Sequence, residues 1–446
     1  MAIAVANAQD ETGNFLFDVI GVDLPTAEGQ AKVDSVNAGR LPLATTDEEL
    51  AAAFETAVAN NTLVATTSHC AYALADIAVV DIHLDVIRGD DGVPTVRFDG
   101  FRKAMRVLGD TMRPGSLVVV ETTVPPGTSE RVVRPTIAEA LQKRGLPDDA
   151  ILVAHSYERV MPGKEYYRSI VNFWRVFAGT TPAAGDACEA FLSKVINTKA
   201  YPLHRLHSTT ASETAKVLEN SYRATNIAFI EEWGQFAEAV GVDLFEVIDA
   251  VRVRPTHSNI RQPGFGVGGY CLTKDPLLAG VGARELFGLE GMDFPFSSRA
   301  VEVNAASPKR SVEILRNRLG GLSDKRILLL GVSYRQDVAD TRYSPSEVFV
   351  QTARAEGATV VSHDPLVTFW QEQNEELPAD IPDPGGFDAV VFAVPHAEYQ
   401  QLDVERWLGA NRPLILDANN VLTLQQRRTI QKVGCPTAAV GRGNEV

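Results

Sequence analysis

The 446-residue sequence is poor in cysteine and in basic charge, and it has no long apolar run. Four cysteines are too few for a disulfide framework, and such sparse use is typical of a reducing compartment. The 42 basic and 57 acidic residues give a net charge of −15, which disfavours nucleic acid and anionic lipid as partners. No stretch approaches the roughly 18 apolar residues of a membrane span, and the pattern of the first residues does not support a secretory signal. We therefore expect a cytoplasmic protein that binds neither nucleic acid nor membrane and has no metal site.

Two segments of the chain alternate short β-branched runs with helical stretches, and the chain is long enough for two or three domains. The first segment covers residues 17–151 and the second begins at Lys325. The strand-like runs are, in order, FDVIGVDL, NTLVATT, ADIAVVDI, SLVVVETTVPP and ILVAHS, then RILLLGVSY, ATVVSHDP, FDAVVFAVP and RPLILDAN. Strands separated by helices predict two α/β, doubly wound, Rossmann-like domains.

A long helix is predicted between the two α/β segments, over Thr209–Val240. This stretch lacks proline and has apolar residues at helical spacing. Thr210 and Glu213 have the spacing of a capping box, and Gly241 marks the end. About 30 residues span roughly 45 Å, which favours a helix that connects the two α/β domains and contributes to a homodimer interface. We therefore predict domains at residues 1–205, 206–310 and 311–446.

The segment PGFGVGGYCLTKDP, residues 263–276, has the composition of a reactive site. Its glycines allow the backbone to approach a ligand closely. Cys271 is followed by Lys274 and Asp275, which are the groups needed to favour a thiolate and to activate a water. The alternative is that Cys271 is only a buried structural cysteine in a glycine-rich loop. We interpret the other three cysteines as structural, because none of them has comparable neighbours.

Five blocks of the sequence resemble the UDP-glucose/GDP-mannose dehydrogenase family, which comprises NAD-dependent nucleotide-sugar 6-dehydrogenases. They are the cysteine segment above, ETTVPPGT (121–128), SYERVMPG (156–163), ETAKVLENSYRATNIA (213–228) and LGVSYRQDVADTRYSPS (330–346). The blocks occur in the family's order, and the resemblance runs from Phe17 to about Leu422. It implies oxidation of the C6 alcohol of a UDP-sugar to the carboxylate by two hydride transfers to NAD.

The resemblance assigns catalytic roles to Glu158 and to five other residues. Cys271 is expected to trap the aldehyde as a thiohemiacetal, which then becomes a thioester. Lys216 and Asn220, four residues apart on one helix face, are expected to stabilise the oxyanion at C6. Asp275 is similar to the carboxylate that orders a water, and Thr123 to a hydroxyl beside the nicotinamide.

The glutamate block of this chain departs from the family pattern. Glu158 matches a catalytic and substrate-binding glutamate, but Tyr157 stands where relatives have proline. Pro162 stands where the UDP-glucose branch has a second glutamate. The pattern resembles the branch that oxidises UDP-N-acetylhexosamines, which is the substrate class we expect, with UDP-glucose as the other choice.

The resemblance also assigns substrate and cofactor contacts. Lys216 and Asn220 contact the sugar as well, and the remaining substrate contacts are Arg254, Asn259, Gly268 and Arg335. His257 stands where the acetamido-sugar branch often has arginine. Arg335 replaces a lysine of many relatives, and its guanidinium suits a diphosphate. The cofactor contacts are Asp23, Thr123, Lys274 and Arg342.

The beginning of the chain lacks a part of the expected cofactor site. Asp23 fits the acidic residue that ends the second strand and binds the adenosine ribose. A first strand and a glycine-rich turn belong about 20 residues before it, yet these residues contain only Gly13 and Gly21. Ala2–Ala8 matches the later part of the helix after that turn. Either the reading frame begins upstream, which we favour, or the chain binds NAD poorly.

Two rival functions remain at this point. One is a non-catalytic homologue that binds a nucleotide sugar but has lost NAD binding. The other is a sugar-nucleotide epimerase, which is disfavoured because no Tyr-x-x-x-Lys pair follows a complete dinucleotide fingerprint.

Overall fold

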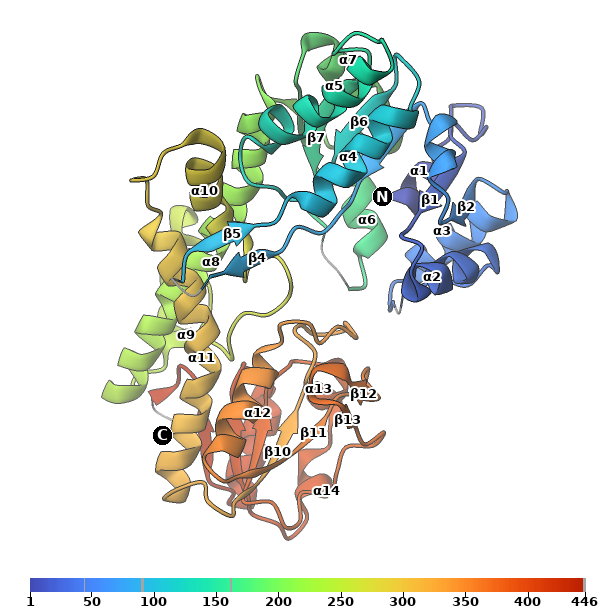
Figure 1. Cartoon of the computed structure of the whole chain (residues 1–446). Helices are drawn as coiled ribbons and strands as arrows, with labels where there is room; N and C mark the ends of the chain where they lie inside the picture. Colours follow the sequence, from blue (N-terminus) through green and yellow to red (C-terminus); the bar gives the residue numbers. More distant parts are fainter. Residues whose placement is uncertain (44, 90–91, 161–162, 444–446) are drawn as a thin grey trace. The chain divides into compact units, whose positions relative to one another are not determined.

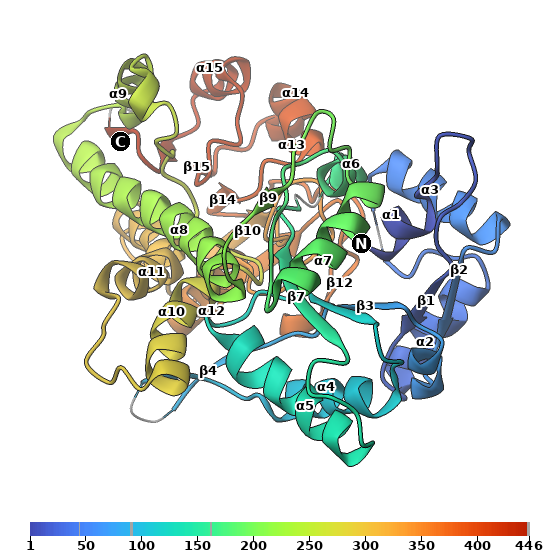
Figure 2. The same cartoon turned by 90° about the horizontal axis from the view of Figure 1, so that it is seen from above.

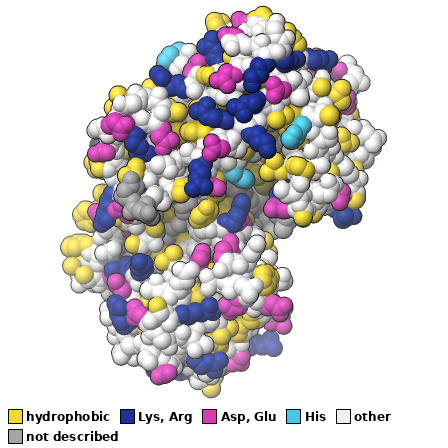
Figure 3. Space-filling view, in the orientation of Figure 1, with side chains coloured by type: hydrophobic (Ala, Val, Ile, Leu, Met, Phe, Trp, Pro, Cys, Tyr) yellow, Lys and Arg dark blue, Asp and Glu magenta, His cyan; other side chains and the backbone are white. Residues whose placement is uncertain are grey.

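A computed structural model describes residues 1–43, 45–89, 92–160 and 163–443, which form two compact units (Figure 1). Unit 1 contains residues 1–219 and 277–294, and unit 2 contains residues 220–276 and 295–446. On the face seen in Figure 3, acidic and basic side chains both occur on each unit. None of the helices among the described residues combines the length and hydropathy needed to cross a bilayer.

Unit 1 holds its strands in a five-stranded sheet, a two-stranded sheet and a hairpin. The five-stranded sheet has the order β3 (Ile77–Val80), β6 (Leu117–Val120), β7 (Leu152–Tyr157), β8 (Val176–Gly179) and β9 (His204–Arg205). Its pairs are parallel except β7 with β8. β1 (Val19–Val22) and β2 (Leu63–Thr66) form the parallel two-stranded sheet, and β4 (Val86–Arg88) and β5 (Pro94–Val96) form the hairpin.

Helices cover both faces of the five-stranded sheet, and its second strand, β6, alternates apolar side chains between two cores. Leu117 and Val119 pack with Phe191 of α7, whereas Val118 and Val120 pack with Met105 of α4. The helices of unit 1 are α1 (Ala2–Ala6), α2 (Ala27–Asn37), α3 (Glu48–Ala59), α4 (Asp99–Thr111), α5 (Arg134–Lys143), α6 (Tyr166–Val171), α7 (Pro182–Val195) and α10 (Leu278–Val281). This is the predicted doubly wound α/β arrangement.

The two sheets of unit 1 share no ladder among the described residues. The pairs β1-β2, β3-β6 and β6-β7 are all parallel. Among the described residues, α1 is the element that precedes β1. It contributes Ala4 and Val5 to the core of the large sheet, and Ala6 to a second core with Phe54 and Leu63.

Unit 2 contains one parallel five-stranded sheet. Its strand order is β11 (Thr359–His363), β10 (Arg326–Leu330), β14 (Ala389–Phe392), β15 (Leu414–Asp417) and β16 (Thr437–Ala439). Helices α11 (Pro295–Leu319) and α12 (Pro345–Ala355) share one core with the sheet; α13 (Ala397–Gln401), α14 (Val404–Leu408) and α15 (Leu424–Val433) share the other. Outside the sheet lie α9 (Leu244–Arg252) and the short hairpin of β12 (Phe369–Trp370) and β13 (Glu375–Glu376). The sheet order corresponds to 2-1-3-4-5, so the second Rossmann-like domain is confirmed.

The long helix α8 covers Thr209–Val240, as predicted, and Gly241 follows it at φ +76°. Its second half lies beside α11 (Figure 2), where Ala224 and Ala228 pack against Ala300. The predicted capping box was wrong. Ser208 caps the helix by accepting the Ala211 N–H at 3.1 Å, and Glu213 has partners outside the helix.

Candidate functional site

The glycine-rich loop of unit 2 presents Cys271 at the surface. The Cys271 carbonyl accepts the N–H groups of Lys274 and Asp275 at 3.3 and 2.9 Å, so one helical turn separates the thiol from the carboxylate. The Cys271 side chain is exposed, whereas Asp275 is completely buried. The other exposed cysteine, Cys70, lies in a short 3-10 helix of unit 1 without these neighbours in sequence.

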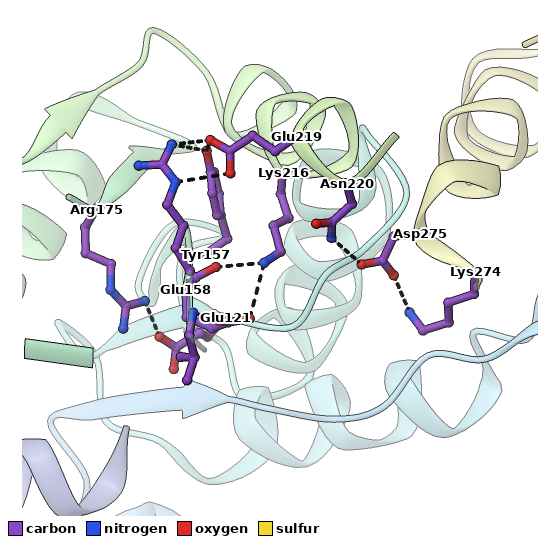
Figure 4. Close-up of polar contacts among 11 residues, drawn as sticks. Glu121, Tyr157, Glu158, Arg175, Lys216, Glu219, Asn220, Lys274 and Asp275 are labelled. Carbon is purple, nitrogen blue, oxygen red and sulfur yellow. Dashed lines mark hydrogen bonds and ion pairs between the residues drawn. The ribbon is translucent and has the colours of Figure 1, made fainter. Parts of the chain in front are cut away.

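Asp275 is held by two donors, which Figure 4 shows. Asn220 of α8 donates its Nδ2 proton to Asp275 Oδ2 at 2.7 Å, and Lys274 Nζ lies 2.7 Å from Asp275 Oδ1. The Lys274 ammonium also lies 4.4 Å from the centroid of the Tyr270 ring. A buried carboxylate needs such partners to remain charged. The structure therefore brings Asn220 and Asp275 together and gives Lys274, which the resemblance assigns to the cofactor, a role as counter-ion.

Lys216 and Glu158 meet in unit 1. The buried Lys216 ammonium donates to the Glu158 carbonyl at 2.7 Å and to Glu158 Oε1 at 3.3 Å. Burial alone would raise the pKa of Glu158, but Lys216 and the Val160 N–H hold the pKa below its ordinary value. Pro162, on which the choice of substrate branch partly depends, lies outside the described residues.

Thr123 lies half-buried in the turn that follows β6. Beside it in sequence, Glu121 forms a buried ion pair with Arg175, with an N–O distance of 2.5 Å. Further along the same turn, the Gly127 and Ser129 N–H groups donate to the Glu213 carboxylate at 2.6 and 2.7 Å. Glu213 therefore fixes the end of the Thr123 turn to α8.

Two buried glutamates of α8 were missed as site residues by sequence reasoning. Glu213 is completely buried, and Glu231 is 3% exposed and accepts the Gly264 N–H of the cysteine loop at 2.8 Å. Burial raises the pKa of each carboxyl group to about 7, against the opposing effect of the N–H donors. Their partners are 33 or more residues away in sequence. The sequence signal that could have identified them is a glutamate at a position of the predicted helix where an apolar residue is expected.

A cavity of about 280 Å³ opens in unit 2 after the carboxyl ends of β10 and β14. These strands flank the topological switch point of the sheet, where ligands bind in open α/β folds. Its lining residues are Phe265, Gly266, Ser333–Gln336, Pro345, Ser346, Ala393–Pro395 and Asn419. Arg335 is thus placed in a cavity, as its predicted substrate role requires. Phe265 and Gly266 also show that the loop carrying Cys271 forms one wall.

The turn after β10 is fixed by a buried carboxylate that sequence reasoning also missed. Asp364, at the end of β11, accepts the N–H groups of Val332 and Ser333 at 2.8 and 2.9 Å, and the Ser333 hydroxyl at 2.9 Å. His396 Nε2 lies 3.2 Å from the same oxygen, and the Asp337 N–H donates to His396 Nδ1. Burial opposes ionisation, but His396 and the N–H donors lower the pKa of Asp364.

Gly268 packs against this same turn. A Cβ atom at Gly268 would lie 2.7 Å from the Tyr343 carbonyl oxygen and 2.8 Å from the Tyr334 Cβ. Glycine is therefore required for the cysteine loop to approach the turn after β10, whether or not the residue also contacts substrate.

Three predicted contact residues do not line the cavity. Arg342 is exposed and forms an ion pair with Asp340 that has three side-chain hydrogen bonds. Arg254 is exposed at the start of a 3-10 turn, and Asn259 donates to the Tyr222 hydroxyl at 3.3 Å. Their predicted substrate and cofactor roles stay predictions.

The residues predicted to contact NAD could hold only a part of that cofactor. Asp23 follows β1, accepts the Leu24 N–H at 2.7 Å and keeps a 40% exposed side chain, which suits a ribose. Thr123 lies in the turn after β6. The described residues before β1, however, form no glycine-rich turn to receive the pyrophosphate. The fit of the described residues to NAD is therefore partial.

Comparison with known proteins settles the family. The NAD-binding, central and UDP-binding domains of the UDP-glucose/GDP-mannose dehydrogenase family match residues 9–195, 210–306 and 328–424. The chain belongs to this family. UDP-N-acetyl-D-mannosamine dehydrogenase of Pyrococcus horikoshii is 31% identical over 75% of each chain, and that of Methanocaldococcus jannaschii is 27% identical over 96% of this chain and 92% of the other.

Solved structures give the same assignment. The structure of UDP-D-ManNAc dehydrogenase from P. horikoshii has a TM-score of 0.81 and 25% identity, over 99% of this chain and 96% of the other. NDP-N-acetyl-D-galactosaminuronic acid dehydrogenase from Methanosarcina mazei has a TM-score of 0.80 and 25% identity, over 100% and 93%. The chain is thus a member of a family of NAD-dependent UDP-sugar dehydrogenases, and its cofactor is NAD.

Proposed function

We propose that the chain oxidises the C6 alcohol of a UDP-N-acetylhexosamine, such as UDP-N-acetylmannosamine, to the carboxylate. The observation that carries this proposal is the double role of one loop. Phe265 and Gly266 line the cavity at the switch point, and Cys271 is exposed six residues after Phe265. The loop that contacts a nucleotide in the cavity would therefore also carry the nucleophile. The similarity to N-acetylmannosamine enzymes, together with the glutamate block, favours the acetamido sugars over UDP-glucose.

Cys271 is proposed as the covalent catalyst. When bound, NAD supplies the hydride acceptor for both oxidations. The Cys271 sulfur adds to the carbonyl carbon of the C6 aldehyde, and the aldehyde oxygen takes the proton to give a thiohemiacetal. After this carbon is oxidised to the thioester, water attacks it, the C–S bond breaks and the thiol is restored with the carboxylate as product. The chemistry needs a reduced thiol, in keeping with the cytoplasmic location that the sparse cysteines predict.

The polar residues on α8 and around it are proposed to act on the C6 oxygen and on the water. The Lys216 ammonium uses two of its three donors on Glu158, and it would stabilise negative charge that develops on the C6 oxygen. The Asn220 amide, fixed by Asp275, has the same role. Asp275 would orient the hydrolytic water, and Glu158 is the second carboxylate proposed to contact substrate.

The test is the stoichiometry of product formation. With UDP-N-acetylmannosamine, UDP-N-acetylglucosamine and UDP-glucose as substrates, the enzyme should form two NADH per sugar oxidised to the acid. Cys271→Ala should abolish formation of the acid, whereas Cys70→Ala, the matched exposed cysteine, should not change it. Release of aldehyde with one NADH per sugar would contradict the role of Cys271. UDP-sugar binding without any NADH would instead support the non-catalytic homologue.

We also propose a homodimer formed through α8. Phe229, Trp233, Phe236 and Val240 are about half exposed and recur at helical spacing, and Trp233 and Phe236 have ring centroids 6.0 Å apart. An exposed stripe of this kind marks an association surface. Light scattering should give twice the chain mass, and Trp233→Glu should give the single mass. A single mass for the unaltered chain would contradict the dimer.

A further inference from the structure

The ring of Tyr157 lies next to two cations in unit 1. Tyr157 ends β7 and is 1% exposed. The Lys216 Nζ lies 5.5 Å and the Arg159 Cζ 5.2 Å from the ring centroid. Both distances are within the roughly 6 Å range of cation–π attraction. Figure 4 shows the ring between the Glu158 segment and α8.

The Tyr157 hydroxyl is held from both sides. It donates to Glu219 Oε1 at 3.2 Å and accepts from Arg159 Nη2 at 3.0 Å. Arg159 and Glu219 are joined directly as an ion pair, and Glu219 lies three residues after Lys216 on α8. Burial, and then Glu219, raises the pKa of Tyr157 above its ordinary value, so the hydroxyl remains a donor. The ring cannot move without breaking these bonds.

The charges of this cluster balance. Lys216 is paired with Glu158 and Arg159 with Glu219. The two cations next to the Tyr157 ring are therefore neutralised by two carboxylates. Lys216 has four rotatable side-chain bonds, and ordering such a side chain is costly in entropy. The Glu158 carbonyl and carboxylate restrain its ammonium from one residue, and the Tyr157 ring provides the second restraint.

We propose that Tyr157, locked by Arg159 and Glu219, is a positioning residue that holds the Lys216 ammonium where it acts. Tyr157 acts through Lys216 and need not touch the substrate. The part of this inference that concerns turnover rests on the proposed function, whereas the restraint on Lys216 does not.

The restraint is tested by chemical labelling of the chain without cofactor or substrate. A short pulse of acetic anhydride, followed by mass spectrometry, gives the acetylation rate of each lysine. Tyr157→Leu should speed acetylation of Lys216 about tenfold, whereas Tyr157→Phe, which keeps the ring but loses the hydroxyl bonds to Arg159 and Glu219, should speed it about threefold. Lys274, which is also buried, should be unchanged in both variants.

A matched control separates positioning from general loosening. Phe177 of β8 is a fully buried aromatic residue of the same sheet, and the cation–π contact found for Lys216 among the described residues is with Tyr157. Phe177→Leu should leave the Lys216 acetylation rate unchanged. The proposal is overturned if Tyr157→Leu leaves this rate unchanged, or if Phe177→Leu raises it equally.

Turnover provides the second measurement. If Lys216 stabilises charge in the transition state, Tyr157→Leu should lower kcat about tenfold with KM nearly unchanged, and Tyr157→Phe should restore most of kcat. A higher KM with an unchanged kcat would contradict the proposal that Tyr157 positions Lys216. If even the unaltered chain forms no NADH, the proposed function fails, but acetylation still decides whether Tyr157 restrains Lys216.

Discussion

Both units have an aspartate directly after a parallel strand, Asp23 after β1 and Asp364 after β11. Asp364 is buried and accepts three hydrogen bonds from the turn after the neighbouring strand β10. That turn, which begins with Gly331 at φ +107°, lines a cavity. Asp23 is half exposed and is bonded within the described residues to its neighbour Leu24, with Lys32 4.0 Å away.

The difference between the two aspartates lies in the neighbouring strand. β11 pairs with β10, whose turn supplies donors, whereas β1 pairs with β2 and, within the described residues, with no second strand. An aspartate at a strand end therefore holds the turn that lines the cavity in unit 2, but remains a surface group in unit 1. The structural role of such a carboxylate depends on whether a neighbouring strand and its turn supply N–H donors.

The largest expected effect is a difference in nucleotide affinity between the units. The 446-residue chain should bind UDP with micromolar affinity and NAD at least about 100-fold more weakly, because the described residues place Arg335 in a cavity of unit 2, whereas those before β1 in unit 1 form no glycine-rich turn for a pyrophosphate. Isothermal titration calorimetry with each nucleotide measures both values. Equal affinities would show that other groups of unit 1 hold the pyrophosphate.

The second prediction compares the two aspartates directly. Asp364→Ala should lower the free energy of unfolding by about 2–4 kcal/mol, because three buried donors lose their acceptor. Asp23→Ala should cost less than about 0.5 kcal/mol, as for most surface changes. Urea denaturation measures both. Asp364→Asn keeps one acceptor oxygen and should fall between them; equal losses for the two alanine variants would refute the contrast.

The third prediction concerns a feature that the units share, a buried glutamate of α8 whose pKa is raised to about 7. Because this pKa lies above the ordinary value of 4.5, the folded chain binds the proton more tightly than the unfolded chain. The stability that this proton contributes is complete below pH 4.5 and is lost as the pH rises through 7. Each glutamate should account for a loss of about 2 kcal/mol between pH 5 and 7.5.

Substitution by glutamine isolates this effect in each unit. Glu213→Gln and Glu231→Gln keep an oxygen acceptor but cannot titrate, so each should flatten the pH dependence of the free energy of unfolding. Glu232→Gln, next to Glu231 but exposed, is the control and should leave the slope unchanged. An unaltered slope in both buried variants would show that these carboxyl groups titrate in their ordinary range.

The smallest predicted effect sharpens the description of unit 2. Arg335 lines the cavity, whereas Arg342 is paired with Asp340 outside it. Arg335→Ala should weaken UDP binding about tenfold, as expected for a charge-assisted bond to a phosphate. Arg342→Ala should change UDP affinity less than about twofold. Calorimetry that gives the reverse order would move the diphosphate away from the switch point.

Much of this fold could be predicted from local patterns. The limits of α8 were predicted residue for residue, because apolar spacing, a proline-free stretch and Gly241 act within a few turns of chain. The strands β1, β2, β3, β6, β7, β10, β11, β14 and β15 were found for the same reason, whereas β8, β9 and β16 were not predicted. The capping interaction of Glu213 was predicted wrongly, because its true partners Gly127 and Ser129 lie more than 80 residues away.

The sequence by itself determined the chemical groups of this protein: the thiol of Cys271, the carboxylate of Asp275, the ammonium of Lys216 and the family to which their blocks belong. The tertiary structure alone decided what those groups touch. Asn220 contacts Asp275, Lys216 contacts Glu158 and lies over the Tyr157 ring, and Asp364 holds the turn of the cavity. These pairs join residues distant in sequence, and contact energies between such residues depend on packing that no local pattern specifies.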